Sequence, residues 1–123
     1  MSRLLIVSYR PAPGNTPAVI ELLRAQYRRA LDLGAQTLSD PLLARSAAGD
    51  LTYIVTFAEA EHVDRCWEDP DFQDLDARLA ELADLIPLRS LGEASASYMD
   101  LEFLNPAAAA PLKPTFRSAL LTD

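Results

Sequence analysis

The chain has 123 residues, 18 of them Asp or Glu and 11 Lys or Arg, and its formal net charge is −7. Half of the residues are hydrophobic, so a chain of this length can bury roughly two thirds of its unfolded surface without disulfides or a metal. The acidic balance argues against nucleic acid as a partner, because phosphate binding depends on concentrated Lys and Arg.

The single cysteine, the apolar segments and the N-terminal residues indicate where in the cell the protein is found. Cys66 has no second cysteine to pair with inside the chain. No segment approaches the about 18 uncharged apolar residues of a membrane span, and the N-terminal residues lack the apolar run and cleavage site of a secretory signal. We therefore expect a cytoplasmic protein with no membrane partner.

The first two predicted elements are a strand and a helix. Residues 4–10 form an apolar run of strand length, rich in Leu, Ile, Val and Tyr, that a Pro-rich segment ends. A helix is predicted over about residues 17–33, with apolar side chains at helical spacing. Asn15 or Thr16 can supply a side-chain oxygen as the cap, and Gly34 suits a left-handed stop.

Two antiparallel strands are predicted next, joined by a hairpin turn. The first covers residues 36–46 and is interrupted at Asp40–Pro41, because proline removes a donor from the sheet. The second covers residues 51–58. Alternate residues of this strand make one aromatic and branched face, namely Tyr53, Val55 and Phe57.

The second half of the chain begins with a strongly acidic helical region. Asp69–Pro70 divides this region into two pieces, since a cap residue followed by proline is typical of a helix start. Its acidic residues are typical of a solvated helix face. We expect the second piece to continue to Ile86 and a last strand to cover residues 95–104.

The predicted order is strand, helix, strand, strand, helix, strand, which is the split βαβ arrangement. We expect a ferredoxin-like α+β domain over residues 1–104, whose four-stranded antiparallel sheet carries both helices on one face. The first and third strands are apolar on both faces, as where Ile54 lies beside Val55, so the second face needs a cover. A second copy of the chain is the simplest cover, and this predicts a homodimer. The Pro- and Ala-rich residues 105–123 are expected to form a separate tail.

Several segments together resemble the antibiotic-biosynthesis-monooxygenase-like (ABM) family of dimeric α/β barrels. They are the strand ending YRPAPGN, the capped helix after it, the TYIVTFA strand running into an acidic helix, and the CWEDPDF break. The resemblance covers about residues 3–104 and implies a homodimer of two sheets paired face to face. The family includes cofactor-free oxygenases, haem-degrading oxygenases, isomerases and proteins with no known activity, so the fold alone does not select a function.

The resemblance argues against haem, and the composition argues against other cofactors. The haem-degrading branch uses a Trp, an Asn on the first strand and a His after the Trp. This chain matches with Trp67, but Ala77 stands at the His position and residues 4–10 contain no Asn. One His and one Cys cannot assemble a usual metal site, and no glycine-rich phosphate loop exists. We therefore expect no metal and no cofactor.

The candidate catalytic residue is His62, the only imidazole and the only ordinary side chain that exchanges protons near neutral pH. Its place in the first turn of an acidic helix is also typical of an exposed residue. Asp100 and Glu102, on one face of the last predicted strand, are a second candidate for acid and base work, or an exposed edge. Cys66 stands among acids that raise the pKa of a thiol, which favours a buried, unreactive side chain.

The candidate substrate-binding residues are Tyr9, Tyr53, Trp67 and Phe72. Each can wall a pocket for a flat ligand, although Trp67 can also fill space between helix and sheet. We expect a cofactor-free monooxygenase acting on a small aromatic or quinone-like compound. The protein then only has to orient an electron-rich substrate, exclude water and supply a base. The alternative is a non-catalytic small-molecule-binding or dimerisation module.

Overall fold

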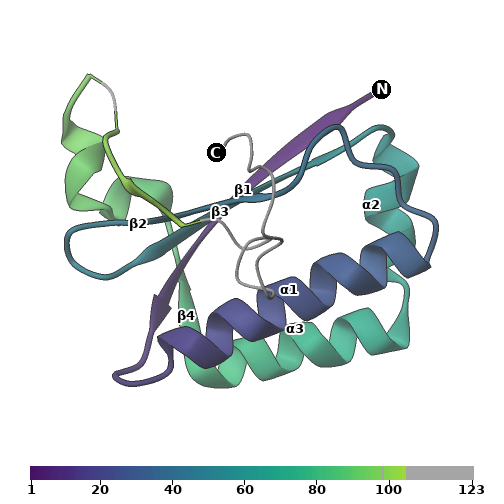
Figure 1. The fold of residues 1–123 in the computed structure, drawn as a ribbon, viewed down its shortest axis with the longest axis horizontal. Helices are drawn as coiled ribbons and strands as arrows, with labels where there is room; N and C mark the ends of the chain where they lie inside the picture. Colours follow the sequence, from purple (N-terminus) through teal and green to yellow (C-terminus); the bar gives the residue numbers. More distant parts are fainter. Residues whose placement is uncertain (98, 105–123) are drawn as a thin grey trace, which may run out of the picture.

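A five-stranded antiparallel sheet and three α-helices make up the described part of the chain, residues 1–97 and 99–104, in a computed structural model (Figure 1). The strand order is β4-β1-β3-β2-β5. The strands are β1 (Arg3–Pro11), β2 (Leu42–Arg45), β3 (Leu51–Phe57), β4 (Ala83–Ile86) and β5 (Glu102–Leu104). The helices are α1 (Thr16–Asp32), α2 (Ala60–Trp67), α3 (Pro70–Leu82) and the short 3-10 helices η1 (Leu88–Ser90) and η2 (Gly92–Ser95).

The first strand and the first helix follow their sequence pattern closely, whereas the strand predicted over residues 36–46 is shorter than expected. Only residues 42–45, which follow Pro41 and its missing N–H donor, pair as β2. The strand predicted over residues 4–10 is β1, and the helix predicted over residues 17–33 is α1, each displaced by one residue at its ends. The cap of α1 differs from expectation, because the side chain of Asn15 makes no hydrogen bond to the helix. Its Nδ2 instead donates to the carbonyl of Leu82 at 3.3 Å, which joins the start of α1 to the end of α3.

The prediction of a four-stranded sheet is wrong, and β4 is the strand that it missed. α3 ends at Leu82, and Ala83 already has an extended backbone with φ −153° and ψ 150°. The next residues pair with the edge of β1, from Ala83 opposite Pro11 to Ile86 opposite Ser8. A short apolar run fits a helix and a strand equally well, so this pairing decides the outcome.

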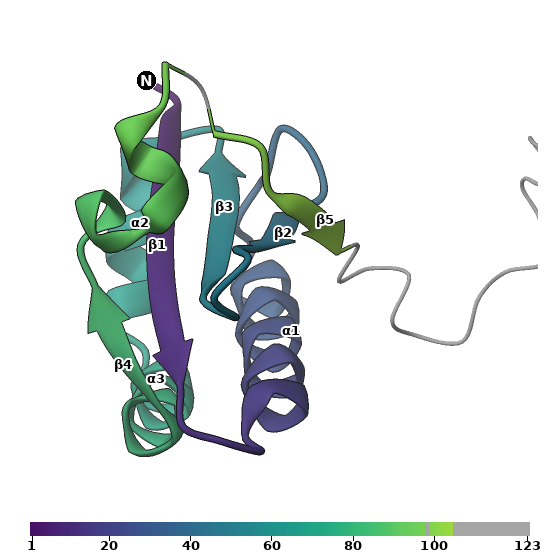
Figure 2. The same cartoon turned by 90° about the vertical axis from the view of Figure 1, so that its left-hand side faces the viewer.

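The strand predicted over residues 95–104 is also largely wrong. Its first residue belongs to η2, and only its last three form β5, which pairs with β2 at the opposite edge of the sheet from β4. Figure 2 shows η1 and η2 in front of β1, with α2 behind it, and β5 beside β2. Tyr98, within that predicted strand, and the tail at residues 105–123 lie outside the described residues.

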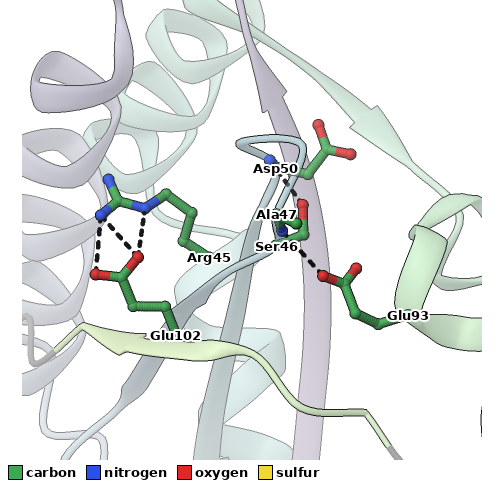
Figure 3. Close-up of polar contacts among 6 residues, drawn as sticks. All are labelled: Arg45, Ser46, Ala47, Asp50, Glu93 and Glu102. Atoms are coloured by element: carbon green, nitrogen blue, oxygen red, sulfur yellow. Dashed lines mark hydrogen bonds and ion pairs between the residues drawn. The ribbon is translucent and has the colours of Figure 1, made fainter.

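The β2–β3 hairpin holds η2 and β5 in place through polar contacts (Figure 3). The guanidinium of Arg45 donates to both carboxylate oxygens of Glu102 at 2.9 and 3.0 Å. Glu93 of η2 accepts a hydrogen bond from the N–H of Ala47 at 2.9 Å. Inside the turn, Ser46 Oγ accepts from the N–H of Asp50 at 3.1 Å. The contacts of Glu102 and Glu93 join distant segments, so periodicity along the sequence does not reveal them.

The two faces of the sheet are covered differently. The face toward α1, α2 and α3 is closely packed and contributes Tyr9, Leu43, Leu51, Tyr53, Val55 and Phe57 to the core. On the other face Ser8 and Thr52 are buried, with their hydroxyl oxygens 3.2 Å apart. Part of that face carries exposed apolar side chains, here named the outer apolar patch: Leu4, Ile6, Leu42 and Phe103, exposed by 44–59%.

One ion pair joins the three helices. Asp69 lies between α2 and α3, and its Oδ2 accepts from the N–H of Phe72 at 2.8 Å, as expected for the cap of α3. Its carboxylate also accepts two hydrogen bonds from Arg29 of α1, at 2.8 and 2.9 Å. The Arg29 guanidinium, helped by the Phe72 N–H, lowers the pKa of Asp69 to about 2.

This shift predicts how acid destabilises the fold. The folded-state pKa of Asp69, about 2, lies below its ordinary value of 3.8, so the pair stabilises the folded protein above pH 3.8 and loses this effect as the pH falls to about 2. Asp69→Asn keeps a capping side chain but removes the charge. We expect the free energy of unfolding, measured by urea titration, to differ most between wild type and Asp69→Asn near neutral pH and to converge in acid.

The exposed residue Asp64 on α2 provides the control for this measurement. Asp64→Asn should leave the acid dependence of the wild type intact. A difference between wild type and Asp69→Asn that stays constant from neutral pH to pH about 2 would contradict the assignment.

Candidate functional site

A cavity of about 70 Å³ lies between the sheet and the helices α1, α2 and α3. Its walls include Tyr9, Tyr53, Trp67 and Phe72, the same side chains that the sequence indicates as substrate-binding. They come from β1, β3, the end of α2 and the first turn of α3. The fold thus brings four distant aromatic residues to one cavity, and their role in binding stays a prediction.

Trp67 and Phe72 lie against each other in the cavity wall. Their rings meet edge to face, with centroids 5.2 Å apart and planes at 83°. Trp67 is 47% exposed, whereas Phe72 is buried, so Trp67 does not simply fill the core. The carbonyl of Trp67 accepts a hydrogen bond from Gln73 Nε2, which fixes the bend between α2 and α3. The indole therefore stands at the open side of the cavity.

The two tyrosines are hydrogen-bond donors at neutral pH. Burial raises the pKa of Tyr9 to about 12, and the nearby Asp76 carboxylate adds to the shift. Burial likewise raises the pKa of Tyr53, with smaller contributions from Tyr27 and Tyr9. Both phenols therefore stay protonated and can donate hydrogen bonds to a ligand, but they do not act as bases.

Gln26 and Asp76 line the same cavity and are absent from the sequence-based candidates. Gln26 lies on the buried stripe of α1 together with Val19, Leu23 and Ala30. Gln26 could therefore have been recognised from the sequence as a candidate site residue, because it is a polar residue within an apolar stripe. Asp76 follows Phe72 by one helical turn on α3 and is half-buried, but the many acids of this region hide it in the sequence.

The expectation of an exposed His62 is wrong. The imidazole is only 9% exposed, and its Nδ1 accepts a hydrogen bond from the N–H of Gln36 at 3.2 Å. His62 is not among the residues that line the cavity with the four aromatic side chains. Its visible role is to anchor the segment that follows α1.

The carboxylate pair Asp100 and Glu102 lies away from the cavity wall, and Cys66 lies in the wall but is unreactive. Glu102 is bound by Arg45, and Asp100 precedes β5. The prediction that the two carboxylates share one face of a strand is therefore wrong. Cys66 lines the cavity but is buried, as expected. Burial raises the pKa of its thiol, and Asp69 adds to this effect, so the thiol stays protonated at neutral pH.

Neither a cluster of metal ligands nor a relative identifies a function for the described part of the chain. Within residues 1–97 and 99–104, no group of three or more His, Cys, Asp or Glu side chains is arranged to hold a metal ion. Over the same residues, no helix has both the length and the apolar character to cross a bilayer. Comparison with known proteins finds no matching family model, no matching curated protein and no matching solved structure. The resemblance to the ABM family therefore stays a prediction.

The position of His62 predicts that it contributes to stability. His62→Ala leaves the Gln36 N–H without its acceptor, which should lower the free energy of unfolding by about 1–3 kcal/mol. His62→Asn places an amide oxygen close to the former Nδ1 and should cost less. Urea titration measures both. An alanine variant as stable as the wild type would show that this hydrogen bond contributes nothing.

Proposed function

We propose that the protein is a homodimeric, cytoplasmic, cofactor-free monooxygenase acting on a small aromatic or quinone-like compound. The observation that carries this proposal is the gathering of Tyr9, Tyr53, Trp67 and Phe72 around one cavity. Mostly apolar and aromatic walls with a few polar groups are typical of sites for flat organic ligands. The lone buried Cys66 is consistent with a reducing compartment.

The size of the cavity limits the substrate. Sites for drug-sized ligands usually measure about 300–1,000 Å³, whereas this cavity measures about 70 Å³. Only part of a small ring system fits inside, and the rest would lie against the half-exposed indole of Trp67. A compound with one or two rings is therefore the proposed substrate class.

The proposed reaction uses no external reductant. A phenol reacts with one dioxygen so that a ring C–H carbon becomes a carbonyl, giving a quinone and one water, and the substrate supplies all the electrons. The protein must remove the phenol proton and orient the ring. His62 is the base that the sequence suggests, but Asp76 lines the cavity and His62 does not. The Tyr9 and Tyr53 hydroxyls can donate to the developing oxyanion.

The order β4-β1-β3-β2 supports a ferredoxin-like core, to which β5 is added beside β2. The outer apolar patch supports a dimer in which two sheets face each other. Ile6, Ile54 and Leu42 stand opposite one another across β1, β3 and β2, which makes a continuous apolar row. Covering such a row with a second copy removes it from water.

The alternative function is a non-catalytic small-molecule-binding or dimerisation module. It is favoured by the hydrogen bond that His62 accepts from the Gln36 N–H, because His62 then serves the fold and does not line the cavity. Asp76 is then the candidate base among the residues that line the cavity. Both functions predict that a ligand binds beside Trp67. They differ in oxygen consumption, which only the monooxygenase shows.

We expect sedimentation at micromolar concentration to give twice the chain mass of 13.5 kDa. Ile6→Glu places a charge inside the outer apolar patch and should give monomers, since an unpaired charge cannot be buried in the interface. Leu85→Glu is the matched control, because Leu85 is 69% exposed but lies opposite Tyr9, on the other face. A monomeric wild type, or an Ile6→Glu dimer, would overturn the proposed interface.

Trp67 is the only tryptophan, so its fluorescence reports directly on the candidate site. We expect small phenols and quinols to quench it saturably and to be oxidised with uptake of one dioxygen per quinone. Trp67→Ala should raise the dissociation constant, followed by calorimetry, about 2- to 13-fold, the effect of an aromatic contact of about 0.5–1.5 kcal/mol. Trp67→Phe should raise it less.

Ligand binding and oxygen uptake together distinguish the monooxygenase from the binding module. Saturable binding with no oxygen uptake from any compound of the panel would favour the binding module over the monooxygenase. No binding by any compound would contradict both.

A further inference from the structure

The amide of Gln26 is a buried hydrogen-bond donor without a partner. The side chain is only 7% exposed, and its Nε2 has no hydrogen-bond partner among the described residues. A buried polar group left unpaired destabilises a protein, so such groups are usually bonded to protein or ligand atoms. Its neighbours on the stripe, Val19, Leu23 and Ala30, are apolar and buried, so packing alone does not require a glutamine here.

Gln26 borders empty space on two sides. It lines the cavity of about 70 Å³ and a second cavity of about 40 Å³. Tyr53 and Phe72 also line both cavities, so the two hollows adjoin one another around the glutamine. Gln26 is therefore part of the wall of both cavities, and its amide Nε2 lacks an acceptor.

Asp76 supplies the complementary group. It lines the larger cavity with Gln26 and also borders the neighbouring groove with Tyr9 and Leu85. An ionised carboxylate only accepts hydrogen bonds, and the bonds it accepts are stronger than those between neutral groups. The larger cavity thus offers a donor from α1 and an acceptor from α3 beside its aromatic walls.

We propose that this cavity selects a small aromatic compound carrying both a carbonyl and a hydroxyl group, with Gln26 donating to the carbonyl and Asp76 accepting from the hydroxyl. The inference deepens the proposed function, since it concerns the same site and rests on it. Asp76 and the net charge of −7 oppose aromatic carboxylates. The recognised class is therefore an uncharged hydroxyaryl ketone or a hydroxylated quinone.

A series of single-ring probes tests the ligand side by calorimetry at a pH slightly below neutral. Para-hydroxyacetophenone carries both groups, para-ethylphenol lacks the carbonyl, and para-methoxyacetophenone lacks the hydroxyl proton. We expect each of the last two to bind the wild type about fivefold more weakly, the factor for one net hydrogen bond. Para-hydroxybenzoate, which is anionic, should bind more weakly than all three.

Substitutions test the protein side with the same probes. Gln26→Met keeps the length of the side chain without its amide, so the preference for the carbonyl should disappear while para-ethylphenol binds as before. It should not lower the free energy of unfolding, because it removes an unpaired polar group. Asp76→Ala should abolish the preference for the hydroxyl. Gln36→Met and Asp74→Ala, at exposed positions, are the controls and should leave both preferences unchanged.

The outcomes distinguish this inference from the proposed function. If the three uncharged probes bind the wild type equally, the inference is wrong while the aromatic site stands. If the wild type binds none of them, both are wrong. If Gln26→Met fails to fold, the wild-type probe series still decides, because loss of the carbonyl must weaken binding.

Discussion

The ion pair between Arg29 and Asp69 fixes the geometry on which the candidate site depends. Asp69 caps α3 and binds α1 at the point where α2 ends. Trp67 precedes it by two residues and Phe72 follows by three, so the bend that Asp69 holds sets the edge-to-face contact between the two rings. Arg29 follows Gln26 by about one turn of α1. The same contact therefore fixes the helix that carries Gln26, a residue of the cavity wall whose amide is unpaired.

The sequence predicted those parts of the fold whose signals are local. A proline-bounded apolar run gives β1, helical periodicity gives α1, and the pair Asp69–Pro70 marks the start of α3. The strands β4 and β5 were mispredicted because they depend on distant partners. Ile86 continues the helical pattern of α3 but pairs with Ser8, and Glu102 is placed by Arg45 across the sheet. No local pattern contains either contact.

The candidate site was predictable by residue type and less so by position. The ability of a large aromatic side chain to wall a pocket indicated Tyr9, Tyr53, Trp67 and Phe72, and these do line one cavity. His62 was expected at the surface because its neighbours are acidic, yet a hydrogen bond from Gln36 holds it inside. Gln26 was visible as a polar residue within an apolar stripe, but its lack of a partner emerges only once the helices and sheet are assembled.

We propose that the cavity between the sheet and the helices holds a small hydroxylated aromatic ketone against Gln26. The most direct measurement is NMR of the labelled protein during titration with para-hydroxyacetophenone. We expect a saturable shift of the Gln26 side-chain amide signals and nuclear Overhauser contacts from the ligand ring to Trp67 and Phe72. Contacts to the outer apolar patch instead, with the Gln26 amide signals unmoved, would contradict it.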